Sequence, residues 1–289
     1  MLFSCHVIIV NYNAGEWLTR AIESVLKYSD AVITIVDNDS SDQSVKTAQQ
    51  KYQNNDRVSW ILNIENKGFA AANNQVLTNL REDFAVLMNP DCEISEDTIP
   101  LLLQAFEQHP TMGLASCKIL NEDRSVQKTC RRRFPTPWSS FVRMLGLHVM
   151  FPNNTAFSNF DYGDRDFKQE VEFVEAISGA FMMVRKQALQ DVGLLDEAYF
   201  MHCEDLDWCK RFELSQWKVG FESQTSVVHA KGVSSRSRPI RVLWTLHTGM
   251  NRFFDKFYRS EFSLLIRGLT KLGICCSFIA RSVVAMLKP

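Results

Sequence analysis

The stretch Val7-Ile8-Ile9-Val10-Asn11-Tyr12-Asn13 decides the fold, because it is an apolar, β-branched run that ends on polar residues. The same form recurs at Ile35-Val36-Asp37-Asn38-Asp39 and at Leu87-Met88-Asn89-Pro90-Asp91. Amphipathic stretches separate these runs. Such alternation is typical of a parallel sheet covered by helices on both faces. We therefore predict an α/β fold.

Further elements follow from the same periodicity. Strands are predicted at 5–11, 31–37, 58–63, 84–89 and 112–120, and helices at 16–28, 42–53, 69–81 and 95–108. Strand-like character resumes at 171–184, where Ser178-Gly179-Ala180 permits a close approach of another backbone.

Composition limits the class of protein. The chain has 289 residues, 46% hydrophobic and 22% charged, so it can bury a full core in one large α/β domain or two small ones. Its net charge of -1 argues against a dedicated nucleic-acid binder, and we expect no nucleic-acid partner. The balance is uneven, because residues 236–289 hold ten basic and two acidic side chains, a net +8 that leaves -9 for the remainder.

The eight cysteines include no CxxC pair, and most lie in apolar runs where a thiol behaves as a small hydrophobe. We therefore expect neither a disulfide framework nor a zinc site. The first residues lack a basic start and a small-residue cleavage site, so no secretory signal is expected. These features favour a cytosolic, reduced setting.

The segment 130–168 interrupts the α/β pattern. Arg131-Arg132-Arg133 precedes Phe134 to Trp138 and a short apolar segment at 141–150, which is too short to cross a bilayer, and 153–168 reads as a polar loop. Two interpretations stay open: a basic, aromatic-rich helix on a membrane surface, or an ordinary packed insertion.

Four predicted strands end on Asp and Asn side chains, which mark a candidate site. Because the carboxyl ends of parallel strands share one sheet edge, a nucleotide-sized ligand fits there. Helix caps and turns are the alternative explanation for each loop alone.

The densest polar cluster is Glu204-Asp205-Leu206-Asp207, at the start of a predicted helix. Asp207 and Arg211 stand four residues apart and are predicted to pair on one helix face. Acidic residues favour a helix N-terminus through its dipole, yet three carboxylates in four positions exceed what capping requires.

Taken in order, six motifs resemble those of family 2 inverting glycosyltransferases, and most of all their bacterial rhamnosyltransferase branch. They are Val7 to Asn13, Val36 to Asp42, Asn66 to Asn74, Asn89-Pro90-Asp91, Gly179-Ala180-Phe181 and Glu204 to Asp207. The similarity covers about 7–235. It implies a GT-A fold, a Rossmann-like nucleotide-binding sheet flanked by helices, in a domain of residues 1–238 with a nucleotide-sugar half at 1–125 and an acceptor half at 126–238.

The resemblance also implies site roles. Asp91 and His229 would hold Mg²⁺ or Mn²⁺, since hard cations prefer oxygen ligands and neutralise a diphosphate; a structural histidine is the alternative for His229. Asp205 would be the catalytic base, with Glu204 and Asp207 orienting it or the acceptor. The residues implied to bind the nucleotide-sugar are Asn11, Asp37, Asn38, Asn66, Lys67, Gly68, Asn73, Asn89 and Arg236. Asn89 departs from the family's commoner aspartate, and Lys231 to Arg236 is expected to be a lid.

The tail, 239–289, is predicted to form basic amphipathic helices that bind an anionic membrane surface. On a helical wheel its cations at 267, 271, 281 and 288 share an arc of roughly 100°, and apolar side chains occupy the rest. The charge-free stretch 272–280 is too short to span a bilayer, and Gly268 and Gly273 argue against one continuous helix. A helix packed on the domain with its cations in water is the alternative.

These expectations combine into one function. They describe an enzyme that moves L-rhamnose from dTDP-rhamnose to a polyprenyl-diphosphate-linked saccharide, in O-antigen-type polysaccharide synthesis at the cytoplasmic face of the bacterial inner membrane. The donor follows from the resemblance alone. A UDP-hexose donor and an inactive membrane-bound scaffold are the alternatives, whereas a nucleotidyltransferase would need a basic glycine-rich loop that Asn11 to Glu16 does not offer.

Overall fold

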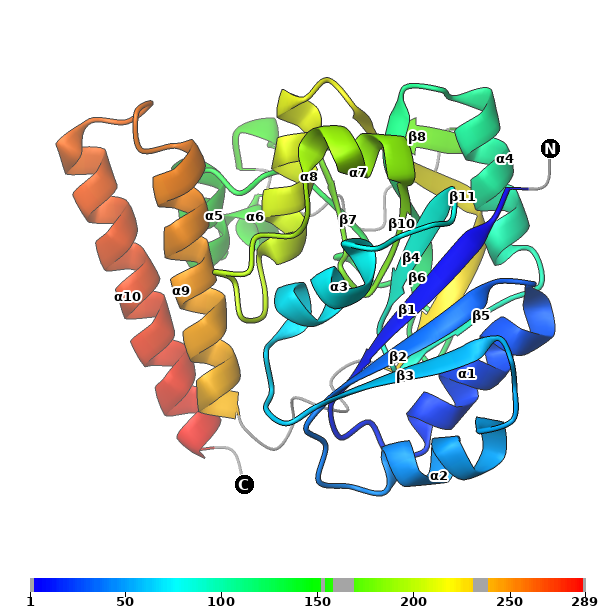
Figure 1. Ribbon diagram of the computed structural model, residues 1–289. Coiled ribbons are helices and arrows are strands. Elements are labelled where there is room, and N and C mark those ends of the chain that lie inside the picture. Colours follow the sequence, from blue (N-terminus) through cyan, green and yellow to red (C-terminus); the bar gives the residue numbers. More distant parts are fainter. Residues whose placement is uncertain (1–2, 152–153, 158–168, 231–238, 288–289) are drawn as a thin grey trace.

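The computed structural model describes residues 3–151, 154–157, 169–230 and 239–287 (Figure 1). A nine-stranded mixed sheet with the order β3-β2-β1-β4-β10-β6-β11-β5 forms its centre, and β8 pairs with β11. The strands are β1 (Cys5–Asn11), β2 (Val32–Asn38), β3 (Val58–Asn63), β4 (Phe84–Met88), β5 (Cys92–Ile94), β6 (Met112–Leu120), β8 (Val171–Phe173), β10 (Phe181–Arg185) and β11 (Lys218–His229). A second, two-stranded sheet joins β7 (Arg131–Arg132) to β9 (Ala176–Ile177).

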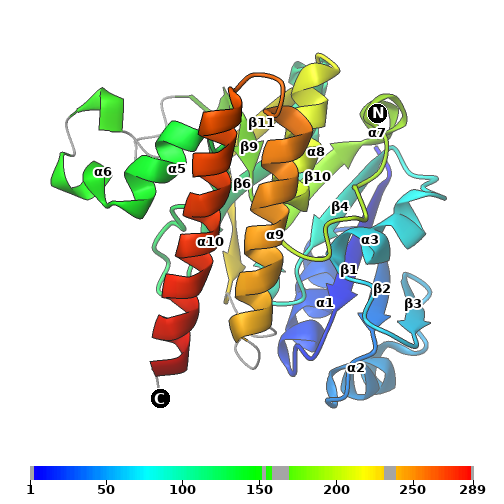
Figure 2. The ribbon, with the colours of Figure 1, turned by 90° about the vertical axis from the view of Figure 1, so that its left-hand side faces the viewer.

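Helices cover both faces of the large sheet. The α-helices of the described residues are α1 (Trp17–Tyr28), α2 (Ser44–Tyr52), α3 (Phe69–Leu77), α4 (Thr98–Gln108), α5 (Pro137–Met144), α6 (Leu147–Met150), α7 (Lys186–Val192), α8 (Glu204–Leu214), α9 (Pro239–Phe257) and α10 (Leu264–Leu287). Helices α1, α2 and α4 lie on one face, and α3, α7 and α8 on the other (Figures 1 and 2). The sequence-based prediction of an α/β fold is confirmed, and the five predicted strands correspond to β1, β2, β3, β4 and β6 and the four predicted helices to α1–α4, with helix ends shorter by up to four residues. The short strand β5 was not predicted.

The sheet is not fully parallel, which corrects one expectation. Strands β3, β2, β1 and β4 are parallel, but β10 runs antiparallel between β4 and β6. Strand β10 is almost entirely buried and reads as the same kind of apolar run as its parallel neighbours. Direction is therefore not encoded in that run, because it depends on how the long segment before β10 returns the chain to the sheet.

Arg131 and Arg132 turn inward and Arg133 alone of the three arginines before α5 is exposed, so the run does not form a basic cluster at the surface. Arg131 is 2% exposed and pairs with Glu172, and Arg132 pairs with Asp205. Helix α5 itself starts with a capping box between Thr136 and Ser139 and a proline at its first position, which explains why the helix begins there.

The tail divides into two helices with different surroundings. Helix α9 is part of the main core, because its Phe253 and Phe254 and the following Tyr258 are buried there. Helix α10 packs on α9 from outside and is one continuous helix through Gly268 and Gly273, contrary to the expectation of a break. It has 24 residues and is long and apolar enough to cross a membrane. The expectation that the apolar part of the tail is too short to span a bilayer was therefore wrong.

Candidate active site

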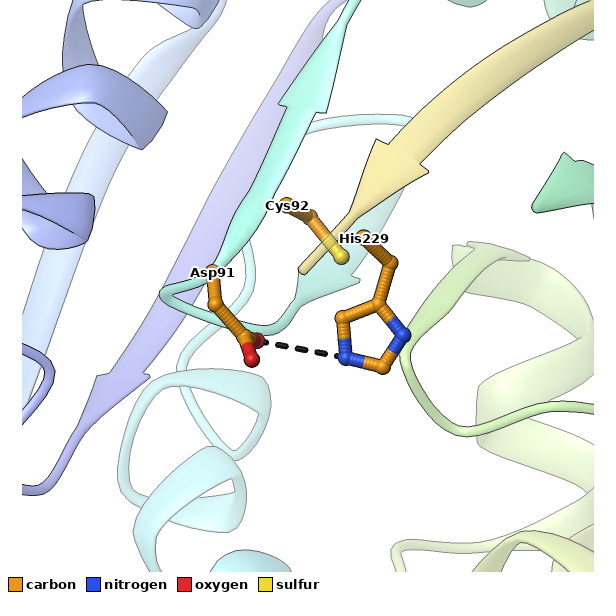
Figure 3. Close-up of side chains that lie close together, drawn as sticks. All are labelled: Asp91, Cys92 and His229. Atoms are coloured by element: carbon orange, nitrogen blue, oxygen red, sulfur yellow. Dashed lines mark ion pairs between the residues drawn. The ribbon is translucent and has the colours of Figure 1, made fainter. Parts of the chain in front are cut away.

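A carboxylate and an imidazole meet at the end of the sheet formed by β4, β5 and β11 (Figure 3). Asp91 follows β4 in the turn before β5, and His229 ends β11, which pairs with β5 so that His229 lies opposite Cys92. The Asp91 Oδ1 and His229 Nε2 atoms are 3.2 Å apart, and both side chains are buried. The structure thus brings together the two residues expected to bind the metal.

Hydrogen bonds fix the orientation of His229. Its Nδ1 lies 3.3 Å from Gln127 Oε1, and the Gln127 amide donates to the His229 carbonyl at 3.0 Å. The tautomer that donates from Nδ1 to Gln127 leaves the lone pair of Nε2 facing Asp91, beside the amide of Asn89 at 3.4 Å. Such outer hydrogen bonds are typical of histidines that bind metals.

This pair fits a divalent cation. Ligand distances of about 2.1 Å place neighbouring ligands of an octahedral ion about 3 Å apart, which matches the separation of Asp91 and His229. Cys92 lies within the same group of donor atoms. However, burial raises the pKa of its thiol far above the usual value, and its Sγ already donates to the Ala180 carbonyl. Asp91 and His229 are therefore the donors suited to Mg²⁺ or Mn²⁺.

The ends of β1 and β2 are joined by buried polar contacts. The Asn11 amide donates to Asp37 Oδ1 at 2.8 Å, and Ser40 donates to the same carboxylate from its hydroxyl and its backbone N–H. Asn38 donates to the Gly68 carbonyl at 3.0 Å. The structure brings these predicted nucleotide-binding residues together, and the Asn11 Oδ1 atom is buried without a partner.

The loop before α3 carries the other predicted nucleotide-binding residues. Asn66 Oδ1 accepts from the Gly68 N–H, whereas Lys67 is exposed. Gly68 has a positive φ of 85°, and a Cβ there would lie 2.3 Å from the carbonyl oxygen of Phe200. Gly68 therefore allows this loop to touch the chain that leads into α8. Asn73 donates within α3 to the Phe69 carbonyl, and its Oδ1 is buried without a partner. Arg236 and the expected lid lie outside the described residues.

Asp205 is held at the start of α8 by groups from two other segments. Its Oδ2 accepts from the Arg132 guanidinium and from the Gly179 N–H at 3.0 Å, and Oδ1 accepts from the Leu206 N–H. Arg132 also donates to the Ile177 carbonyl at 2.8 Å. Burial acts to lower the pKa of Arg132, but the charge and hydrogen bond of Asp205 outweigh it and raise that pKa above its usual value.

The two neighbouring carboxyls differ from Asp205. Glu204 is buried, its Oε2 has no hydrogen-bond partner, and burial together with the charge of Asp205 raises its pKa to about 8. Asp207 is fully buried and pairs with Arg211 Nε at 2.7 Å, which confirms the predicted pairing, and with Lys256 Nζ of α9 at 2.5 Å. Both Asp207 oxygens are thus engaged away from Asp205, an arrangement that favours a structural role for Asp207.

The two halves of the site meet at one dipeptide. Gly179 N–H donates to Asp205, while the Ala180 carbonyl accepts from the Asn89 N–H at 2.9 Å and from the Cys92 thiol. The carboxylate of Asp205 and the turn that carries Asp91 are therefore separated by two residues of chain, not placed on opposite sides of the molecule.

Sequence reasoning missed Arg132 and Gln127. For the segment of Arg132 the sequence left a membrane-surface cluster and a packed insertion open, and Gln127 gave no signal. Arg132 contacts a residue 73 positions away and Gln127 one 102 positions away.

The fold and the site define a GT-A glycosyltransferase. The chain belongs to Glycosyl transferase family 2, whose sequence profile matches residues 6–193. The resemblance drawn from the motifs is thereby confirmed.

Similar proteins give the comparison more detail. The chain is 27% identical to an N-acetylglucosaminyl-diphospho-decaprenol L-rhamnosyltransferase of Mycobacterium tuberculosis, over 83% of this chain and 80% of the relative. It is 24% identical to the rhamnosyltransferase WbbL of Escherichia coli, over 93% and 94%. A crystal structure of GalNAc-T7 with UDP, GalNAc and Mn²⁺ superimposes with a TM-score of 0.60 at 17% identity, over 79% of this chain and 44% of that one. The structural likeness confirms the GT-A fold.

Proposed function

We propose that this enzyme transfers L-rhamnose, with inversion, from dTDP-rhamnose to a polyprenyl-diphosphate-linked saccharide in cell-surface polysaccharide synthesis of the O-antigen type. The observation that carries the proposal is the joining of Asp205 and the Asp91–His229 pair through Gly179-Ala180. The rhamnosyltransferase relatives, one named for a decaprenol-linked acceptor, support the sugar and the lipid.

Asp91 and His229 would hold the cation. When bound, a divalent cation neutralises the donor diphosphate and stabilises it as the leaving group. Gln127 orients His229 for this contact, and Asn89, beside Nε2, offers an amide to the donor. The polar ends of β1 and β2 would hold the nucleotide, with Asn11, Asp37 and Asn38 nearest the sheet and Asn66, Lys67, Gly68 and Asn73 around them.

Asp205 would take the proton of the attacking hydroxyl. Arg132 and the Gly179 N–H occupy its Oδ2, which leaves Oδ1 the freer oxygen for the acceptor. The raised pKa of Glu204 favours its protonated form, and a protonated carboxyl is a hydrogen-bond donor beside the Asp205 carboxylate. A charged base beside a neutral acid suits inverting transfer.

The tail would attach the enzyme to the cytoplasmic face of the membrane. In α10 the apolar side chains are exposed, among them Leu265 at 73% and Leu269 at 59%, while Lys271 pairs with Asp255 of α9. A helix packed on a soluble domain buries its apolar side chains, and α10 does the opposite. Exposed apolar side chains suit a helix that lies in the membrane interface. Because α10 packs lengthwise on α9, a peripheral attachment fits better than a span (Figure 2).

A donor panel tests the proposal. The purified enzyme is offered dTDP-rhamnose, UDP-hexoses and GDP-sugars with Mg²⁺ or Mn²⁺ and a polyprenyl-diphosphate-linked N-acetylhexosamine, and nucleotide release is measured. Release of dTDP is expected, whereas release of UDP would support the second candidate, a UDP-hexose donor, which the UDP-bound structural neighbour favours. No nucleotide release from any donor of the panel would favour an inactive scaffold.

Asp205→Asn tests the base. Loss of a general base lowers kcat by about 100-fold or more, while the donor dissociation constant should stay within about twofold. Near-normal transfer by this variant would remove Asp205 from the mechanism.

A further inference from the structure

Helices α5 and α6 expose an unusual amount of apolar surface. In α5 one apolar side chain, Val142, is fully buried, and the helix otherwise turns large apolar groups outward. The exposed ones on α5, α6 and the residues beside them are Trp138, Phe141, Met144, Leu145, Val149, Met150 and Phe151. Trp138 stacks on Phe141 at 5.8 Å, so the patch is an ordered surface. Exposed patches of this kind mark sites of interaction.

The patch is continuous with the apolar side of α10. Helix α5 contacts α10, and the two lie side by side on the same flank of the molecule (Figure 2). Ten large apolar side chains of α10 are exposed: Leu264, Leu265, Ile266, Leu269, Leu272, Ile279, Val283, Val284, Met286 and Leu287. We call the exposed side chains of 138–151 and of α10 together the apolar flank.

The charges of the apolar flank select its partner. Residues 134–151 and 264–287 contain no Asp or Glu, and their charged side chains are Arg143, Arg267, Lys271 and Arg281. In a symmetric dimer the same surface faces itself, so these cations would meet cations with no acid of the flank between them. An anionic bilayer supplies both the apolar interior and the negative surface that such a flank requires.

The flank also lies close to the proposed base. Strand β7 places Arg132 on Asp205, and α5 begins only five residues later, at Pro137. That length of chain reaches no more than about 18 Å. Between them the Phe134 ring is buried and stacks on Phe253 of α9, which ties the connection to the core.

We propose that α5 and α6 form a second membrane contact, which together with α10 seats the enzyme on an anionic bilayer with the Asp205 side of the site near the lipid surface. For the identity of the acceptor this rests on the proposed function; the lipid contact itself does not. A catalytic base joined to the membrane-contacting helix by a few residues suits an acceptor whose diphosphate is anchored in lipid. The acceptor sugar then reaches the base while it stays close to the bilayer surface.

Binding of the full chain to vesicles tests the contact. Sedimentation with vesicles of phosphatidylethanolamine and phosphatidylglycerol is compared for the wild type, Val149→Ser/Met150→Ser in α6, and Leu62→Ser/Ile64→Ser at the opposite edge of the sheet. Val149 and Met150 are 71% and 66% exposed, and Leu62 and Ile64 are 56% and 94% exposed, so both pairs remove exposed apolar groups without disturbing the core. We expect about tenfold weaker binding for the α6 variant and no change for the control.

Several outcomes would overturn the proposal. Unchanged vesicle binding of the α6 variant would contradict it, even if Leu265→Ser/Leu269→Ser in α10 releases the protein from the vesicles. An equal loss of binding in the α6 variant and in the Leu62/Ile64 variant would also contradict it. A concentration-dependent dimer in light scattering that the α6 variant dissociates would assign the flank to a second copy. Vesicle binding without sugar transfer from any donor would contradict the proposed function and still support the membrane contact.

Discussion

Replacing Arg132 by Met tests the geometry of the site most directly. Methionine keeps much of the side-chain length but removes the guanidinium, which leaves the Asp205 carboxylate with only the Gly179 and Leu206 N–H groups and leaves the Ile177 carbonyl without its donor. The side chains of Arg132 and Asp205 are 15% and 12% exposed, so water replaces little of the lost ion pair. Breaking a buried pair of this kind costs about 3–5 kcal/mol.

This loss is large enough to measure by heat and by kinetics. For a chain of this size it lowers the Tm by about 10 °C. Because Arg132 contacts Asp205 and none of the strand ends proposed to bind the donor, kcat should fall at least tenfold while the KM for the donor stays within about twofold. In a double-mutant cycle, Arg132→Met should add little to Asp205→Asn.

The neighbouring arginine supplies the matched control. Arg131 is also buried in β7, but it pairs with Glu172 of β8. Arg131→Met should destabilise the protein comparably and leave kcat near the wild-type value at a temperature where the variant is folded. Equal losses of kcat in both methionine variants, or additive effects of Arg132→Met and Asp205→Asn, would refute the view that Arg132 positions the base.

Three further predictions follow from single contacts. Gln127→Ala should weaken Mn²⁺ binding about tenfold or more by calorimetry, because His229 loses the partner that orients it, and an unchanged affinity would contradict this. Gly68→Ala should lower the free energy of unfolding in urea by about 2–4 kcal/mol, because the new Cβ would meet the Phe200 carbonyl. The control Gly15→Ala has a positive φ but open space around it, and it should lower that free energy by about 1 kcal/mol. Equal losses in the two variants would argue against the contact with Phe200. The pKa of Glu204 is raised from 4.5 to about 8, so the protonated carboxyl contributes stability that is full below pH 4.5 and is lost as the pH rises through 8. The Tm of Glu204→Gln should therefore rise relative to the wild type between about pH 5 and about pH 9. A difference in Tm that does not change with pH would exclude a neutral Glu204.

The local pattern of the sequence predicts most of the sheet formed by β1 to β4. Strands β1 to β4 were predicted within one residue at either end, since a short apolar run between amphipathic stretches has few other folded forms. The polar ends of those strands were expected at one sheet edge, and there Asn11 donates to Asp37 while the next residue, Asn38, donates to Gly68. The i, i+4 pairing of Asp207 with Arg211 was predicted for the same reason, because helix geometry alone decides it.

The sequence by itself determined the class of fold, the polar sheet edge and the residues that resemble a glycosyltransferase site. Only the tertiary structure decided that β10 is antiparallel, that Arg132 meets Asp205, that Gln127 supports His229, and that α9 lies in the core while α10 faces outward. The physical reason is separation along the chain. Contacts between neighbours in sequence obey the helix and strand periods, whereas a pair 73 or 102 residues apart exists only once the sheet has brought its segments together.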